Sequence, residues 1–230
     1  MDIAVPRKAV SPGLPRLRIG APAGPLLTEA SLMRALDVAG AALALLLFAP
    51  LLLLIAAAVK LEDGGPVFYA QQRLGRGGRN FGCLKFRSMA PDAAARLQAL
   101  LESSAEARAE WGRDHKLKDD PRRTTVGVFL RRTSLDELPQ LLNVLRGEMS
   151  LVGPRPIVAE EVVRYGRRYA SYVRVRPGIT GLWQVSGRND TTYRRRVALD
   201  HTFVRRGGLR LYVWILLVTI PAVLLRRGSY

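Results

Sequence analysis

Residues 38–59 read VAGAALALLLFAPLLLLIAAAV, a stretch of twenty-two residues without a charged side chain. A helix of about 20 apolar residues is long enough to cross the hydrocarbon core of a bilayer. Pro50 falls near the middle, where a proline removes a helical hydrogen bond and bends or breaks the helix. The stretch therefore predicts a membrane-associated protein, and Pro50 bears on how the chain meets the membrane.

The charges on either side of this stretch favour the same side of the membrane. Five Lys and Arg against two acids precede Asp37, and 31 against 16 follow Val59. Because basic residues favour the cytoplasmic side, we predict a re-entrant helix-break-helix hairpin over residues 31–60 with its break at Pro50. A kinked spanning helix is the alternative, since large domains translocate or stay largely regardless of charge. A signal peptide fits poorly, because the lead-in is long and rich in proline.

Composition limits the class of protein. The 230 residues are enough for one good core, and a second full domain is not expected. Cys83 is the single cysteine, which excludes an intramolecular disulfide, and His115 and His201 belong to no zinc or triad pattern. The net charge of +17 calls for an anionic partner, namely nucleic acid, anionic lipid or a phosphorylated substrate. Residues 1–30 are basic and rich in proline, which predicts a disordered arm.

Two short strands are expected after the membrane segment. The segment PVFYAQQRLGRGGRNFGCLKFRSM, residues 66–89, has apolar stretches on either side of a glycine-rich turn. The turn lacks the P-loop pattern, so its glycines are interpreted as turn formers. Alanine, leucine and alternating charges at helical spacing then predict a surface helix over residues 91–111.

Two adjacent acids stand out in the basic stretch RRTSLDELPQLLN, residues 131–143. Ser134 and Glu137 have the spacing of a capping box, which predicts a helix start and a structural role for the acids. Pro139 would then fall fifth in the helix, where it is poorly tolerated, whereas capping by Asp136 would place it in the first turn. These residues alone leave the register of the helix start open.

The last third of the chain adds a constrained arginine, a loop and an apolar run. Arg155 lies between two prolines that fix its backbone, which suits either bidentate phosphate recognition or a structural ion pair. The segment PGITGLWQVSGRN, residues 177–189, is expected to be a structured loop. The run that contains Tyr212 and Trp214 predicts an interfacial helix within residues 206–230, or equally a core helix of the body.

Three motifs together resemble the bacterial sugar transferases that are monotopic polyprenyl-phosphate phosphoglycosyltransferases: KFRSM (85–89), LRRTSLDELPQLLNVLRGEMSLVGPRP (130–156) and PGITGLWQVSGRN (177–189). The resemblance implies an α+β fold class, a mostly helical membrane-associated catalytic domain with short strands over residues 61–205, the re-entrant hairpin, and interfacial amphipathic helices. It also implies the cytoplasmic face of the bacterial inner membrane and contact with membrane lipids.

The same resemblance implies a reaction and its site. A sugar phosphate passes from a UDP-sugar to polyprenyl (undecaprenyl) phosphate, with release of UMP. Asp136 is then the nucleophile that forms an aspartyl-phosphosugar intermediate, and Glu137 is a ligand of Mg²⁺. An ionised aspartate needs no general base, and Mg²⁺ prefers carboxylates together with substrate phosphates. The implied phosphate-binding and substrate-binding residues are Lys85, Arg87, Arg131, Arg155, Gln184 and Arg188.

The sequence differs from the family pattern at two positions, and two alternative functions are considered. Ala49-Pro50 replaces the usual Ser-Pro of the break, and Tyr212 stands where relatives commonly carry an acid. A membrane-tethered nucleic-acid-binding protein would need a reader motif, and the sequence has none. A non-catalytic scaffold would not need the intact acids and cations. The resemblance implies glucose or galactose as the first choice of sugar, and the oligomeric state, a homo-oligomer included, stays open.

Overall fold

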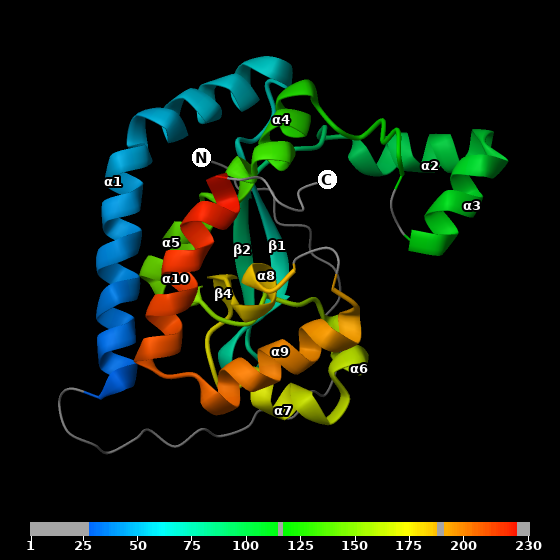
Figure 1. The fold of residues 1–230 in the computed structure, drawn as a ribbon. Coiled ribbons are helices and arrows are strands. Elements are labelled where there is room, and N and C mark those ends of the chain that lie inside the picture. The colour runs from blue at the N-terminus through cyan, green and yellow to red at the C-terminus, as the bar shows by residue number, and fades with distance from the viewer. Residues whose placement is uncertain (1–27, 115–116, 188–190, 225–230) are drawn as a thin grey trace.

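Helices make up most of the structure, a computed structural model that describes residues 28–114, 117–187 and 191–224. Short strands lie at the centre of the body (Figure 1), so the α+β class is confirmed. The arm predicted over residues 1–30 lies outside the described residues, apart from its last three. The helices are α1 (Glu29–Asp63), α2 (Ala93–Ser103), α3 (Ala105–Asp114), α4 (Thr125–Thr133), α5 (Gln140–Arg146), α6 (Val162–Tyr165), α7 (Tyr169–Tyr172), α8 (Leu182–Val185), α9 (Tyr193–Arg206) and α10 (Leu209–Leu224), and the strands are β1 (Phe68–Leu74), β2 (Asn80–Phe86), β3 (Ser150–Val152) and β4 (Gly178–Thr180).

Helix α1 contains the apolar stretch and continues through Pro50. Thr28 caps its first turn by accepting from the Ser31 N–H, and Gly64 ends it in the left-handed conformation, with φ 72°. Figure 1 shows the helix running along one side of the body and then bending across its top. Among the described residues it is the one helix long and apolar enough to cross a membrane. The predicted break is thus a bend in a continuous helix, and re-entry into a bilayer stays a prediction.

The outer face of α1 is exposed and apolar. Its inner face packs on α4, α5, α10 and β3. The outer leucines are 66–75% exposed, and they are Leu43, Leu46, Leu47, Leu53 and Leu54. A contiguous apolar surface of this kind marks an interaction with lipid or another protein, and the length of α1 favours lipid.

The strands follow the prediction, and the surface helix departs from it. Strand β1 pairs antiparallel with β2, from Phe68 opposite Phe86 to Leu74 opposite Asn80, across the predicted glycine turn. Strand β3 pairs in parallel with β4. The helix predicted over residues 91–111 is two helices, because the Ser104 side chain accepts from the Ala107 N–H and so starts a new helix.

The capping box predicted at Ser134 and Glu137 is wrong. Ser134 instead ends α4 in the left-handed conformation, with φ 58°, and the two acids lie in a short 3-10 turn over Leu135–Glu137. Helix α5 begins at Gln140, directly after Pro139. Proline cannot donate a backbone hydrogen bond and its ring clashes inside a helix, so α5 starts only beyond it.

A buried carboxylate fastens the start of α1 to the body. Asp37 is 3% exposed, and its Oδ1 accepts from Ser150 Oγ (2.9 Å), the Leu151 N–H (2.7 Å) and the Tyr212 hydroxyl (2.6 Å). Tyr212 is 1% exposed, so its predicted place at a membrane interface is wrong, whereas Trp214 on the same helix is 48% exposed. The core-helix alternative therefore holds for the inner face of α10.

Removal of this carboxylate should destabilise the whole body. Asp37→Ala leaves three buried donors without an acceptor, and we expect a loss of about 3 kcal/mol in the free energy of unfolding. Tyr212→Phe removes a single donor and should cost about 1 kcal/mol. Urea unfolding in detergent, followed by tryptophan fluorescence, measures both. Equal losses for the two variants would contradict the role of Asp37 as the shared acceptor.

Candidate active site

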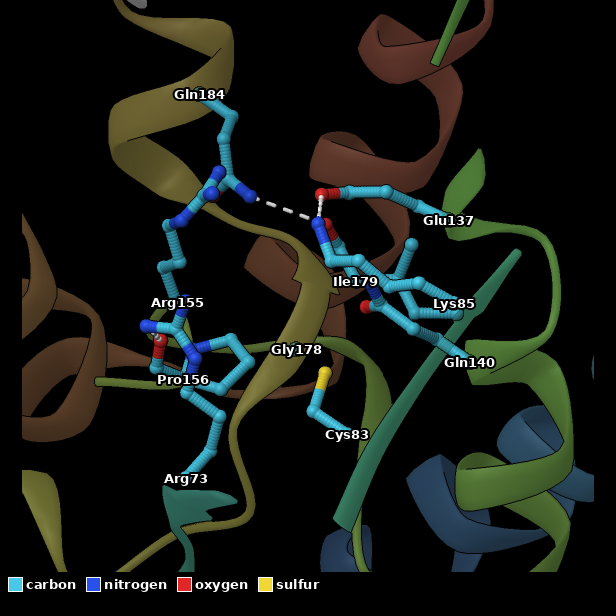
Figure 2. A pocket seen from close by; sticks show the side chains of 10 residues that line it. All are labelled: Arg73, Cys83, Lys85, Glu137, Gln140, Arg155, Pro156, Gly178, Ile179 and Gln184. Atoms are coloured by element: carbon cyan, nitrogen blue, oxygen red, sulfur yellow. Dashed lines mark hydrogen bonds and ion pairs between the residues drawn. The ribbon is translucent and has the colours of Figure 1, made fainter. Parts of the chain in front are cut away.

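One pocket gathers residues from all three sequence motifs, although they lie far apart in the chain (Figure 2). Four of the predicted site residues line it: Lys85, Glu137, Arg155 and Gln184. The other lining residues are Arg73, Cys83, Gln140, Pro156, Gly178 and Ile179.

The side chain of Asn143 holds the segment that contains Asp136 and Glu137 against strand β2. Its side chain is fully buried, and its Nδ2 donates to the carbonyl of Gly82 (2.8 Å) while its Oδ1 accepts from the N–H of Leu84 (2.9 Å). The amide thus pairs with the edge of β2 that β1 leaves open. Because Lys85 follows Leu84, this contact sets Lys85 beside the acids that precede α5.

Close-packed glycines bring Arg155 and Gln184 to the same pocket. A Cβ on Gly178 would lie 2.0 Å from the Gly153 nitrogen, and one on Gly153 would lie 2.6 Å from the Arg176 carbonyl oxygen. Only glycine permits this approach, on which the pairing of β3 with β4 depends. Figure 2 shows Arg155 extending toward Gln184 above the pocket.

Lys85 is the cation closest to the acid pair. Its Nζ lies 2.6 Å from Glu137 Oε1 and 3.8 Å from Asp136 Oδ2. Burial alone would raise the pKa of Glu137, but the charges of Lys85 and Arg155 hold that pKa below its ordinary value. Burial raises the pKa of Asp136 above its usual value, and Glu137 adds to this effect while Lys85 opposes it. The surroundings therefore shift the pKa values of the two neighbouring carboxylates in opposite directions.

Arg73 joins Arg155 in the pocket and was missed from the sequence. It donates to the Pro156 carbonyl oxygen (3.1 Å) and lies 3.6 Å from a Glu161 oxygen. Burial and the nearby charge of Arg155 lower the pKa of Arg73. Arg155 itself forms no hydrogen bond or ion pair with the residues that the structure describes. The sequence signal that could have identified Arg73 is its position as the one charged residue of the strand Phe68–Leu74.

Two further residues of the pocket, Cys83 and Gln140, carry no charge at neutral pH. Cys83 is 2% exposed, and burial raises the pKa of its thiol to about 11, so it stays protonated at neutral pH. Gln140, also missed from the sequence, is buried at the start of α5 and offers amide groups to the pocket.

The structure places the other predicted cations elsewhere. Arg87 is 7% exposed, and its guanidinium binds the Asp63 carboxylate and the Pro66 carbonyl at the end of α1. Its place is therefore structural and outside the pocket, which corrects the prediction of a phosphate contact. Arg131 is exposed on α4 and reaches Asp136 only through its charge, which lowers the pKa of that acid. Arg188 lies outside the described residues.

The family model for bacterial sugar transferase matches residues 28–226. This chain belongs to the bacterial sugar transferase family. The chain is therefore a transferase, as the motifs predicted, and Asp136, Glu137, Lys85 and Arg155 all lie within the matched region.

Its relatives include short and long proteins. The chain is 52% identical to the exopolysaccharide production protein ExoY of Rhizobium meliloti over 197 residues, which cover 86% of this chain and 87% of ExoY. It is 42% identical to the UDP-glucose:undecaprenyl-phosphate glucose-1-phosphate transferase of Caulobacter vibrioides over 91% of this chain and 76% of that protein. It is 49% identical to the undecaprenyl-phosphate galactose phosphotransferase of Salmonella typhimurium, covering 86% of this chain but 42% of that relative.

The acid pair is chemically suited to Mg²⁺. The described residues contain no group of three or more His, Cys, Asp or Glu that could hold a metal ion. Mg²⁺ is usually bound by only one or two carboxylates, with waters and substrate phosphates as its other ligands. Asp136 and Glu137 supply that number, and the lowered pKa of Glu137 keeps it ionised.

Removal of Lys85 from this transferase should raise the pKa of Asp136 further. Lys85→Met takes away the cation that favours the ionised carboxylate, so Asp136 should protonate at a higher pH than in the unmodified protein. The carboxyl carbon of ¹³C-labelled aspartate, followed by NMR against pH and assigned with Asp136→Asn, measures this. Lys118→Met, at an exposed lysine, is the matched control and should leave the Asp136 titration unchanged. An unmoved titration in Lys85→Met would contradict the electrostatic coupling.

Proposed function

We propose that this transferase moves a sugar 1-phosphate from a UDP-sugar to undecaprenyl phosphate, releases UMP, and so starts the assembly of an exopolysaccharide. The observation that carries the proposal is the pair of acids, Asp136 and Glu137, held against Lys85. Glu137 and Lys85 line the same pocket as Arg155, whose guanidinium has no hydrogen bond or ion pair within the described residues, and Asp136 lies next to that lining. The relatives named for undecaprenyl-phosphate glucose and galactose transfer support this substrate class, and they favour glucose or galactose as the sugar.

Asp136 is the nucleophile in the first proposed step. A carboxylate oxygen attacks the β-phosphorus, and the bond between that phosphorus and the bridging oxygen breaks. UMP leaves with the bonding electrons, and the sugar phosphate stays on Asp136 as an acyl phosphate. The raised pKa of Asp136 makes it more basic than an ordinary aspartate, and a more basic carboxylate is a stronger nucleophile while it stays ionised.

The cations of the pocket make the attack of an anion on an anion feasible. Lys85 and Arg155 provide positive charge where the diphosphate would lie, and Arg73 adds a third cation. Guanidinium groups suit phosphate because they donate two parallel hydrogen bonds. Gln140 and Gln184 supply the neutral polar groups that would help to orient the substrate.

Undecaprenyl phosphate is the acceptor in the second step. One of its phosphate oxygens attacks the phosphorus of the acyl phosphate, the bond to the Asp136 oxygen breaks, and the free carboxylate returns. The acyl phosphate conserves the free energy of the phosphoanhydride for this transfer. Asp136 is only 8% exposed, which limits the access of water that would otherwise hydrolyse the intermediate.

Glu137, with Asp136 beside it, would hold the proposed Mg²⁺. Such an ion would neutralise charge on the diphosphate and on the UMP leaving group. Glu137 Oε1 now accepts a hydrogen bond from Lys85 Nζ at 2.6 Å, so Lys85 would turn toward the substrate phosphate when Glu137 binds a cation. The four-carbon stem of lysine permits this change at little cost.

Without an acceptor lipid, the purified protein should release UMP only once. With Mg²⁺ and UDP-glucose or UDP-galactose in detergent, we expect about one equivalent of UMP and a phosphosugar adduct on Asp136, found by mass spectrometry. Asp136→Asn should release none, whereas Asp119→Asn, at an exposed aspartate outside the pocket, should behave as the unmodified protein. If UMP forms only after undecaprenyl phosphate is added and no adduct is trapped, the two-step mechanism is wrong.

We also propose that α1 enters the cytoplasmic leaflet of the inner membrane and returns, which leaves both flanks in the cytoplasm. The bend of α1, its exposed leucines and its basic flanks support this topology.

Single cysteines on either side of α1 test the topology. Cys83 is buried with a pKa of about 11, so it should not react with a thiol label at neutral pH. Gly20→Cys and Ala99→Cys should both be labelled by a membrane-impermeant maleimide in inverted vesicles, and neither should be labelled in right-side-out vesicles. Labelling of the two cysteines from opposite sides would establish a spanning helix instead.

A further inference from the structure

A second cavity, of about 210 Å³, lies near the start of α1. It is formed by the first turns of α1, the turn between β1 and β2, the residues before β4, and the junction of α9 with α10 (Figure 1). It shares no lining residue with the candidate active site. No step of the proposed reaction uses it.

The charges around this cavity are strongly unbalanced. Four arginines line it, namely Arg34, Arg76, Arg174 and Arg176, against one acid, Asp37. Arg34 lies 4.0 Å from Asp37, whose other oxygen is taken by the three donors described above. Within the described residues, the other three arginines have no acid within ion-pair distance. Glu29 is another acid at the start of α1, but its carboxylate lies near Gly208 and does not line the cavity.

Two of these guanidinium groups are already held in place. Arg34 donates to the carbonyl oxygens of Val144 (2.8 Å) and Leu145 (3.1 Å), and Arg176 Nε donates to that of Gly147 (2.8 Å). Val144, Leu145 and Gly147 lie at the C-terminal end of α5, so the carbonyl groups of one helix end orient both arginines. Side chains fixed in this way lose little conformational entropy when they bind a ligand.

The arginines also repel one another. Burial lowers the pKa of Arg176, and the charges of Arg34 and Arg76 lower it further. A set of like charges kept close without counter-charges destabilises the folded protein, and a bound anion would relieve the repulsion. Arg34 and Arg176 also hold the carbonyl end of α5, whereas Arg76 and Arg174 have no ion pair within the described residues, and a cluster of like charges that lowers stability in this way is typical of a binding site.

Apart from Ser150 and Tyr212, whose hydroxyls donate to Asp37, the rest of the lining is apolar and includes Met33, Val152 and Phe203. The cavity therefore has a cationic side and an apolar side, at the end of the helix whose outer face is exposed and apolar. A phosphate fits the cationic side, because guanidinium groups bind its oxygens in pairs.

We propose that this cavity binds a phosphate group, carried by an anionic membrane lipid or present as free phosphate, at a site separate from the active-site pocket.

Binding of two probes to the full chain in maltoside detergent tests this site. The probes are dihexanoyl phosphatidylglycerol, below its micelle concentration, and inorganic phosphate. All samples carry Arg155→Gln, which weakens phosphate binding at the active-site pocket. The test variant is Arg76→Gln/Arg174→Gln, at two exposed arginines of the cavity, and the matched control is Arg167→Gln/Arg168→Gln, at two exposed arginines outside it. Calorimetric titration gives the dissociation constants.

We expect saturable binding of at least one probe, weakened about tenfold or more in the test variant and less than twofold in the control. Binding of the lipid alone assigns the site to a lipid head group, and equal binding of inorganic phosphate assigns it to free phosphate. The absence of saturable binding to both probes, or equal weakening in both variants, would overturn the proposal. Transfer activity does not enter these readouts, so failure of the proposed reaction leaves them unaffected.

Thermal unfolding without any probe separates a binding role from a structural one. Because Arg76→Gln/Arg174→Gln removes repelling charges, its Tm should equal or exceed that of the parent protein. A Tm several degrees lower would show that the two arginines stabilise the fold, and it too would overturn the proposal.

Discussion

The candidate active site depends on the hydrogen bonds of one buried amide, Asn143. A sheet of only two strands leaves the outer edge of β2 with unpaired N–H and C=O groups inside the body. Asn143 satisfies one of each, at Leu84 and Gly82, and also donates to Glu148. A buried polar network with every member satisfied permits one arrangement and penalises the alternatives. The helix that follows the acids is therefore held in a single register against the strand that carries Lys85.

That register explains how two adjacent carboxylates have different surroundings. Pro139 delays the start of α5, and Ser134 ends α4, so Asp136 and Glu137 lie in a tight turn between two helices. Burial dominates at Asp136, whereas the charges of Lys85 and Arg155 prevail over burial at Glu137. Surroundings that shift the pKa values of two titratable groups in opposite directions allow neighbouring acids to act differently.

Local patterns predicted those parts that depend on neighbouring residues. The two strands around the glycine turn and the long apolar helix are both found. The grouping of Lys85, Glu137, Arg155 and Gln184 was implied by the family resemblance and not by a local pattern, and the pocket brings these four together. Errors arose where a distant partner decides the outcome. Arg87 looked like a second phosphate ligand beside Lys85, but Asp63, on another element, takes its guanidinium. Tyr212 looked like an interfacial aromatic residue until Asp37, 175 positions away, proved to be its acceptor. A sequence pattern identifies a charge or a hydroxyl, but not the distant group that pairs with it.

Helix α1 is held to the body by acids at both ends, and its middle is left to apolar contacts. Asp37 fastens the first part through Ser150 and Tyr212. At the other end Asp63 binds Arg87, and Glu62 accepts from the first N–H groups of α4. The bend at Pro50 and the exposed leucines lie between these two anchors. Since Arg87 lies two residues beyond Lys85, the ion pair with Asp63 also ties the segment that carries Lys85 to the end of α1. In the proposed reaction, a lipid that meets the apolar face of α1 would therefore present its phosphate to a pocket whose lysine is held on the same rigid body.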